Sequence, residues 1–134
     1  MTDDELIQGF ESTTLPAEQF THEAHVRVAW WYLTHLPMLA AVAAFAEGLQ
    51  RFAAAKGAAG KYHETMTVAW MLLVADRIVA PADSVWTEFA EHNPDLFVKS
   101  PSPLARYYSE ACLASDRARQ TFVLPGASRS HPRP

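Results

Sequence analysis

The chain has one cysteine, Cys112, among its 134 residues. A single cysteine excludes an intramolecular disulfide, and it cannot supply the several thiolates that a structural zinc site usually needs. Its sequence neighbours are alanine and leucine, and free cysteines are among the residues most often buried. We therefore expect Cys112 to be a small residue of the core.

Glycine is also scarce, with five dispersed residues, so the sequence has no glycine-rich loop that could cradle phosphates. It contains neither the Gly-x-Ser-x-Gly motif of a serine hydrolase nor the His-Glu-x-x-His helix of a zinc protease. The segment His22-Glu23-Ala24-His25 is one residue shorter than that helix motif. These absences argue against nucleotide cofactors and serine hydrolysis.

Positive charge is sparse and scattered, since 11 basic against 15 acidic residues give a formal net charge of -4. Nucleic-acid binding needs basic residues gathered on one face, so we expect no nucleic-acid partner. The acidic N-terminus lacks the pattern of a secretory signal, and Pro37, Glu47 and Asp76 interrupt the longest apolar runs. We therefore expect a cytoplasmic protein that does not span a membrane.

The chain is rich in apolar residues, 49% of the total, and many of them recur at helical spacing. This pattern predicts an all-α fold, a single compact bundle of about five to seven helices in residues 1–124 with a flexible tail at 125–134. The expected helices cover residues 3–11, 21–35, 37–56, 61–79 and 83–93, with one or two more between 104 and 120. Thr2, Thr21 and Asp83 are the expected N-caps, and residues 122–124 are expected to pack back as a short strap.

Three of the six histidines stand at the starts of two expected helices, His22 and His25 on one and His63 on the other. His22 and His25 are three residues apart, so they project from one helix face and can share a metal ion. His63 completes a three-histidine site if its helix lies beside theirs, which leaves an open position for water or substrate. Glu23 and Glu64 are candidates for a fourth ligand or a general base. The expected ion is a divalent first-row metal (zinc, iron, nickel or copper), and the alternative is that the histidines are core residues with one satisfied nitrogen.

A second group of polar residues is the segment Arg106-Tyr107-Tyr108-Ser109. Arginine can hold a carboxylate or phosphate through two parallel hydrogen bonds, and a tyrosine can donate a proton to a developing oxyanion. Arg106, Tyr107 and Tyr108 are therefore candidates for orienting an anionic substrate. The alternative interpretation is an interhelical salt bridge and ordinary packing of the two tyrosine rings.

Several of these blocks together resemble a group of short bacterial all-helical proteins to which no reaction is assigned. The blocks are Phe20-Thr21-His22-Glu23-Ala24-His25-Val26-Arg27, Lys61-Tyr62-His63-Glu64-Thr65, Asn93-Pro94-Asp95-Leu96, Arg106-Tyr107-Tyr108-Ser109 and Ser115-Asp116-Arg117-Ala118-Arg119. The resemblance covers nearly the whole chain and implies that the blocks belong to one fold. The chain is also similar, more weakly, to DinB-like helical bundles, which hold a metal with three histidines from separate helices. Its paired histidines, three residues apart, depart from their spacing, so that similarity is an analogy of fold.

Three functions follow from these patterns. The first is a small metal-dependent enzyme in which His22, His25 and His63 bind the ion and a small, anionic molecule is the substrate. The second is a non-catalytic helical module that binds a small ligand or a second copy of itself, as a homodimer, through its tryptophan-rich surface. The third is a metal-free enzyme in which His25 or His63 is a general base.

Overall fold

The computed structural model describes residues 1–98 and 101–126, and within them it consists of α-helices and short 3₁₀-helices without a strand. The α-helices are α1 (Asp3–Glu11), α2 (His22–His35), α3 (Met38–Ala55), α4 (Glu64–Asp76), α5 (Trp86–His92), α6 (Glu110–Leu113) and α7 (Asp116–Gln120). The 3₁₀-helices are Ala17–Gln19, Ala59–Lys61, Pro81–Ser84, Pro94–Phe97 and Pro103–Arg106. The expected compact all-α bundle is therefore confirmed.

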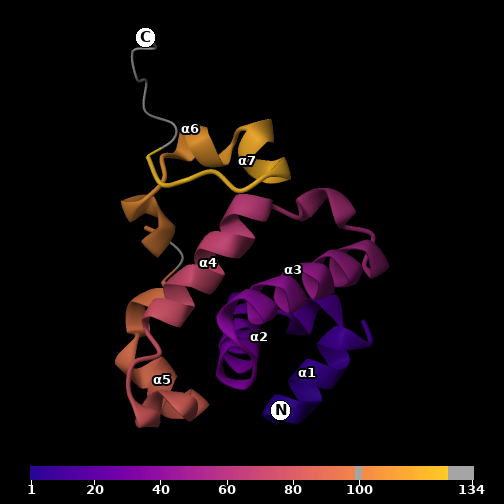
Figure 1. Ribbon diagram of the computed structural model, residues 1–134. Coiled ribbons are helices and arrows are strands. Elements are labelled where there is room, and N and C mark those ends of the chain that lie inside the picture. The colour runs from indigo at the N-terminus through magenta and orange to yellow at the C-terminus, as the bar shows by residue number, and fades with distance from the viewer. Residues whose placement is uncertain (99–100, 127–134) are drawn as a thin grey trace.

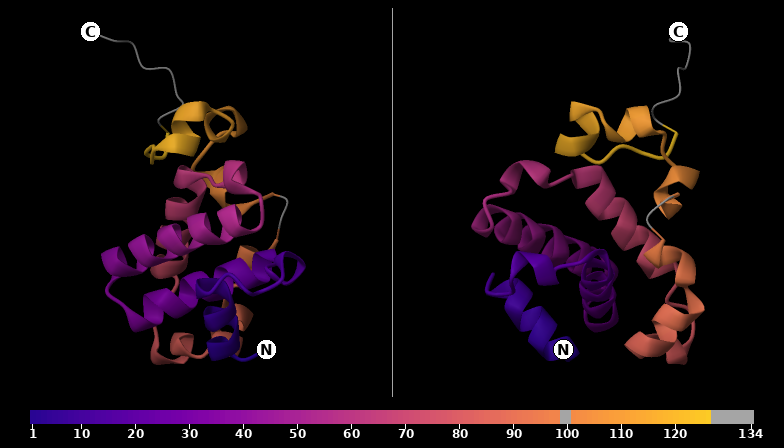
Figure 2. Two further views of the ribbon diagram at one scale, coloured as in Figure 1. Left: turned by 90° about the vertical axis from the view of Figure 1, so that its right-hand side faces the viewer. Right: turned by 180° about the vertical axis from the view of Figure 1, so that it is seen from behind.

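Helix α2 lies at the centre of this arrangement, because it contacts both α3 and α4. Helices α1, α2 and α3 pack together on one side of the molecule, and α4 runs beside them (Figure 1). The further views show α6 and α7 over the end where α4 begins and α5 at the opposite end (Figure 2). The first turn of α2 carries both histidines, and the His22 ring contacts Trp70 of α4.

Two of the three expected N-caps are confirmed. The Thr2 hydroxyl accepts a hydrogen bond from the Glu5 N–H at 3.1 Å, and the Glu5 carboxylate accepts one from the Thr2 N–H at 2.8 Å. The Thr21 hydroxyl accepts from the Ala24 N–H at 3.2 Å and begins α2. Each cap satisfies backbone donors that the first turn of a helix leaves without partners.

The expected helix 61–79 is shorter in the structure, and the expected N-cap at Asp83 is wrong. Helix α4 begins at Glu64 because His63 is its N-cap, and it ends at Asp76. Asp83 lies inside a 3₁₀-helix, where its carboxylate accepts hydrogen bonds from the N–H groups of Val79 and Ala80 at 3.0 and 2.9 Å. The bond from Ala80 caps the start of the 3₁₀-helix Pro81–Ser84, so Asp83 holds the connection between α4 and α5 and does not cap α5.

The core on the α1 side is aromatic, and Phe10 lies at its centre without solvent exposure. Its ring is 5.2 Å from that of Phe20, 6.1 Å from Phe45 and 5.8 Å from Phe52, measured between ring centroids. Gly48 permits this packing, because a Cβ there would lie 2.6 Å from a ring carbon of Phe10. The phenylalanines bring α1, α2 and α3 into one core.

Cys112 is buried, as expected.

The expected strap is present, although it forms no strand. Val123 is buried, its N–H donates to the Thr65 hydroxyl at 3.1 Å, and its carbonyl accepts from the Tyr108 hydroxyl at 2.7 Å. This segment therefore ties the C-terminal helices to the first turn of α4. Of the expected tail at 125–134, residues 127–134 lie outside the described residues.

Within the described residues, α3 is the one helix that is long and apolar enough to cross a membrane by length and composition. It carries Glu47 and Arg51 and packs on α2 and α4. Of its 18 residues, 22% are buried inside the structure. Core helices of globular proteins meet the same criterion. The expectation that this chain does not span a membrane stays a prediction.

Candidate ligand-binding cavity

A cavity of about 520 Å³ lies between α2, α3 and α4, and the three singled-out histidines all line it. Its volume is within the range of about 300–1,000 Å³ that small-molecule sites usually have. The lining residues are Ala17, Phe20, His22, His25, Val26, Ala29, Phe45, Leu49, Phe52, Ala53, Lys56, Ala58, Lys61, Tyr62, His63, Met66, Thr67, Trp70 and Val74. The structure therefore brings the two helices that begin near these histidines together at one cavity.

The walls of this cavity are mainly apolar and aromatic. Phe20 and Phe52 meet edge to face with 4.7 Å between their ring centroids. Trp70 of α4 contacts the His22 ring in the same geometry at 5.1 Å. Such walls favour a ligand whose body is apolar, because covering them removes hydrocarbon surface from water.

The charged residues that line the cavity are both lysines. Lys56 follows the last turn of α3 and lies with its ammonium nitrogen 5.3 Å from the Phe52 ring centroid, in a cation–π contact. Lys61 ends the 3₁₀-helix Ala59–Lys61. No aspartate or glutamate is among the described residues of the lining. The described lining therefore carries two positive charges and no negative one.

His25 presents a neutral imidazole to the cavity. Its Nδ1–H donates to the Thr21 carbonyl at 2.8 Å, and its ring stacks on Phe20 with 3.7 Å between centroids. Burial lowers the pKa of His25, and the nearby His22 lowers it further, while the bond to Thr21 opposes this shift. The hydrogen bond and the stack hold the tautomer and the plane of the ring.

The other ring nitrogen of His25, Nε2, has no hydrogen-bond partner among the described residues. No buried side-chain nitrogen or oxygen in the described part of the chain lacks a partner. An unpartnered Nε2 must therefore be accessible, and the space that His25 lines is the cavity. His25 thus offers the cavity a hydrogen-bond acceptor.

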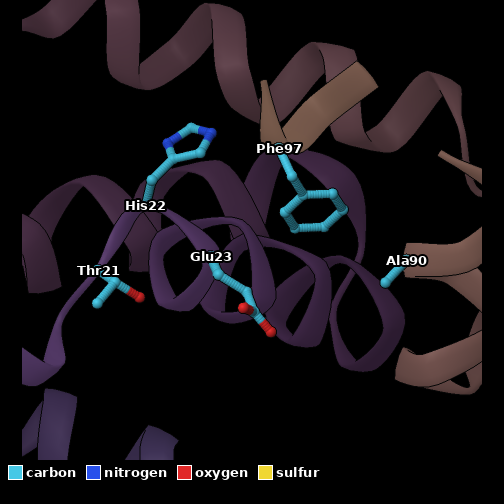
Figure 3. A pocket seen from close by; sticks show the side chains of 5 residues that line it. All are labelled: Thr21, His22, Glu23, Ala90 and Phe97. Carbon is cyan, nitrogen blue, oxygen red and sulfur yellow. The ribbon is translucent and has the colours of Figure 1, made fainter. Parts of the chain in front are cut away.

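His22 lies between the main cavity and a second, more open hollow on the surface. This hollow is lined by Thr21, His22, Glu23, Ala90 and Phe97 (Figure 3). The His22 Nε2–H donates to the Leu96 carbonyl at 2.8 Å, which anchors α2 to the 3₁₀-helix Pro94–Phe97. The His22 ring and the Glu23 carboxylate point in different directions (Figure 3), so the two do not form a pair.

His63 uses both ring nitrogens in the fold. Its Nδ1 accepts a hydrogen bond from the Met66 N–H at 3.1 Å and caps α4, and its Nε2–H donates to the Leu113 carbonyl at 2.7 Å. The side chain is 7% exposed. His63 therefore connects the start of α4 to the end of α6 and has no nitrogen lone pair left for another partner.

The arrangement of these three histidines does not fit a metal site as it stands. Within the described part of the chain, no three histidine, cysteine, aspartate or glutamate side chains form a group that could hold a metal ion. An ion bound by all three would require His63 to give up its cap on α4 or its bond to Leu113. The three-histidine metal site stays a prediction.

Glu64, the second expected acid–base residue, begins α4 beside the cavity. Its carboxylate accepts a hydrogen bond from the Tyr62 hydroxyl at 2.5 Å. Burial of Tyr62, together with this hydrogen bond, raises the pKa of the phenol to about 12. Glu64 is therefore engaged by a phenol that keeps its proton, and it is not among the residues that line the cavity.

The segment expected to orient an anionic substrate lies elsewhere. Arg106 and Tyr107 are exposed near the 3₁₀-helix Pro103–Arg106, and neither lines the cavity. Tyr108 is buried and donates its hydroxyl proton to the Val123 carbonyl at 2.7 Å. The structure therefore does not bring these residues to the three histidines, and Tyr108 has the packing role of the alternative interpretation.

Sequence reasoning missed the lysines and phenylalanines of the cavity. Lys61 and Phe20 are the first residues of the two blocks that contain the histidines, so their position along the chain was a usable signal. Lys56 and Phe52 come from the end of α3, which the sequence placed in a helix without indicating which of its faces borders the histidines. No family model, curated protein or solved structure matches this chain.

Proposed function

We propose that this protein binds a small, mainly apolar molecule with one negative charge in the cavity between α2, α3 and α4. The observation that carries the proposal is the composition of the lining, which combines aromatic walls with Lys56 and Lys61 and has no carboxylate among its described residues. An apolar body would cover the walls, and a carboxylate would be drawn towards the lysines. The proposal corresponds to the ligand-binding alternative derived from the sequence.

The affinity expected for a small probe is moderate. The anion 2-naphthoate has roughly 13 non-hydrogen atoms, and at about 0.4 kcal/mol each its binding free energy is about 5 kcal/mol. This corresponds to a Kd on the order of 0.1 mM. Affinity in this range is measurable by calorimetry or by chemical-shift titration.

The test compares 2-naphthoate with 2-(aminomethyl)naphthalene, which keeps the ring and reverses the charge. We expect the anion to bind at least about tenfold more tightly, because two lysines and no acid line the site. Changing Lys56 or Lys61 to glutamine should weaken the binding of the anion about two- to fivefold, which is the usual effect of one exposed charge. Arg117→Gln is the matched control, since Arg117 is exposed on α7 and does not line the cavity.

The location of the site is tested by filling it. Ala53 lines the cavity from α3, whereas Ala43 is exposed on the same helix. We expect Ala53→Trp to abolish binding of 2-naphthoate and Ala43→Trp to leave it unchanged. Equal binding of the anion and the amine, or binding that survives Ala53→Trp in the folded protein, would overturn the proposal.

A further inference from the structure

The His25 Nε2 lone pair is a polar feature of the cavity that has no partner among the described residues and that the proposed ligand, as described so far, does not engage. The Nδ1–H bond to Thr21 directs the proton to Nδ1, so Nε2 is an acceptor. A carboxylate has acceptor oxygens only and gains nothing from this nitrogen. The charged end of the ligand therefore belongs at the lysines, and some other group has to meet His25.

Covering the lone pair with hydrocarbon would weaken binding. In the empty cavity the nitrogen is accessible to water, and an apolar ligand that displaces the water leaves a buried acceptor unpaired. Unpaired buried acceptors reduce an equilibrium constant by about 5- to 100-fold. A ligand that supplies a donor at this point avoids that loss.

We propose that the ligand of this cavity also carries a hydroxyl or N–H group that donates to His25 Nε2. The inference rests on the proposed function and narrows the ligand class to hydroxylated or N–H-bearing carboxylates with an apolar body. The stack on Phe20 and the bond to Thr21 hold the acceptor in place before the ligand arrives. Little ordering of this side chain is therefore needed on binding. His25 is on this proposal a specificity-determining residue.

The fold offers a closely matched control for His25. His35, on the last turn of the same helix, also directs its Nδ1 to the carbonyl four residues earlier, that of Trp31 at 2.7 Å. Its ring also stacks on an aromatic ring, that of Trp31, with 4.0 Å between centroids. His35 is exposed and does not line the cavity. His25→Phe and His35→Phe thus make the same chemical change at similar positions, and only the first removes an acceptor from the cavity.

The experiment measures the affinities of 2-naphthoate and a panel of hydroxy-2-naphthoates that place the hydroxyl at different ring positions. We expect at least one hydroxylated anion to bind the wild-type protein about 3- to 10-fold more tightly than 2-naphthoate. The preference should vanish in His25→Phe and persist in His35→Phe. The fold should tolerate His25→Phe, because a phenyl ring can keep the stack and the Thr21 carbonyl still accepts the His25 backbone N–H at 2.9 Å.

Nitrogen-15 NMR of the histidine rings gives a second readout that does not depend on affinity. In the free protein, His25 Nε2 should show the resonance of an unprotonated nitrogen, and a hydroxylated anion should shift it more than 2-naphthoate does. If every hydroxylated anion binds no better than 2-naphthoate, or if the preference survives His25→Phe, the donor inference fails while the proposed function stands. If none of the anions binds, both fail.

Discussion

Replacing His63 separates its structural role from a role as a metal ligand. In His63→Ala, α4 loses its N-cap, which costs about 1 kcal/mol of unfolding free energy. The Leu113 carbonyl loses the imidazole donor at 2.7 Å, which costs about 1 kcal/mol or somewhat more for a partly buried group. The expected destabilisation is therefore about 2 to 3 kcal/mol. For a domain of this size it lowers Tm by about 6 to 15 °C.

The variant His63→Asn divides this loss into its two parts. Asparagine is a favourable N-cap but is too short to replace the imidazole at Leu113, so we expect about half the destabilisation of His63→Ala. Urea unfolding followed by circular dichroism at constant m value measures both. Equal losses for alanine and asparagine would show that the cap contributes nothing.

The wild-type protein and His63→Ala together also test the three-histidine metal site. A ligand present at 100 times its Kd stabilises the native state by about 2.7 kcal/mol. Because His63 uses both nitrogens, we expect added Zn²⁺, Fe²⁺, Ni²⁺ or Cu²⁺ not to raise the Tm of the untagged protein. If His63→Ala is as stable as wild type in metal-free buffer, the structural account of His63 is refuted. A metal-induced rise in Tm that disappears in His63→Ala would instead support the three-histidine metal site.

Three further predictions concern stability, one through the core and two through its pH dependence. Gly48→Ala should lower the free energy of unfolding by about 1 to 3 kcal/mol through overlap with the Phe10 ring, although alanine is the better helix former. Ala43→Gly, at an exposed position of α3, is the control that measures this helix preference alone. A Gly48→Ala protein more stable than wild type would refute the overlap. Because burial lowers the pKa of His25, the unfolded chain binds a proton that the folded chain does not, so stability should begin to fall as pH drops below about 6.5. In His25→Phe, the decrease of Tm that begins below about pH 6.5 should be absent. An unchanged profile of Tm against pH would contradict this prediction. The pKa of Asp95 is lowered by its hydrogen bonds to Arg77, so its contribution should be lost at lower pH, below about 4, and should be absent in Asp95→Asn.

Local rules predicted the helices well where the interactions that begin and end them are local. Thr2 and Thr21 cap their helices through residues three positions away, so the cap can be identified from the sequence. Asp83 follows the same residue preference, yet its carboxylate bonds backward to Val79 and Ala80. A short polar side chain near a helix end can bond in either direction, and the sequence does not say which.

The sequence by itself determined that the chain is all-helical and that His22 and His25 share one face of α2, because both follow from helical spacing and local capping. Tertiary structure alone decided what each histidine does. His63 meets Leu113, 50 positions away, and thereby becomes a structural residue. No described segment from elsewhere in the chain donates to His25 Nε2, and Lys56 joins the site because the end of α3 packs beside α4. The physical reason is that a ring nitrogen has one lone pair or one proton to share, and the packing of remote segments determines whether the fold uses it or leaves it for a ligand.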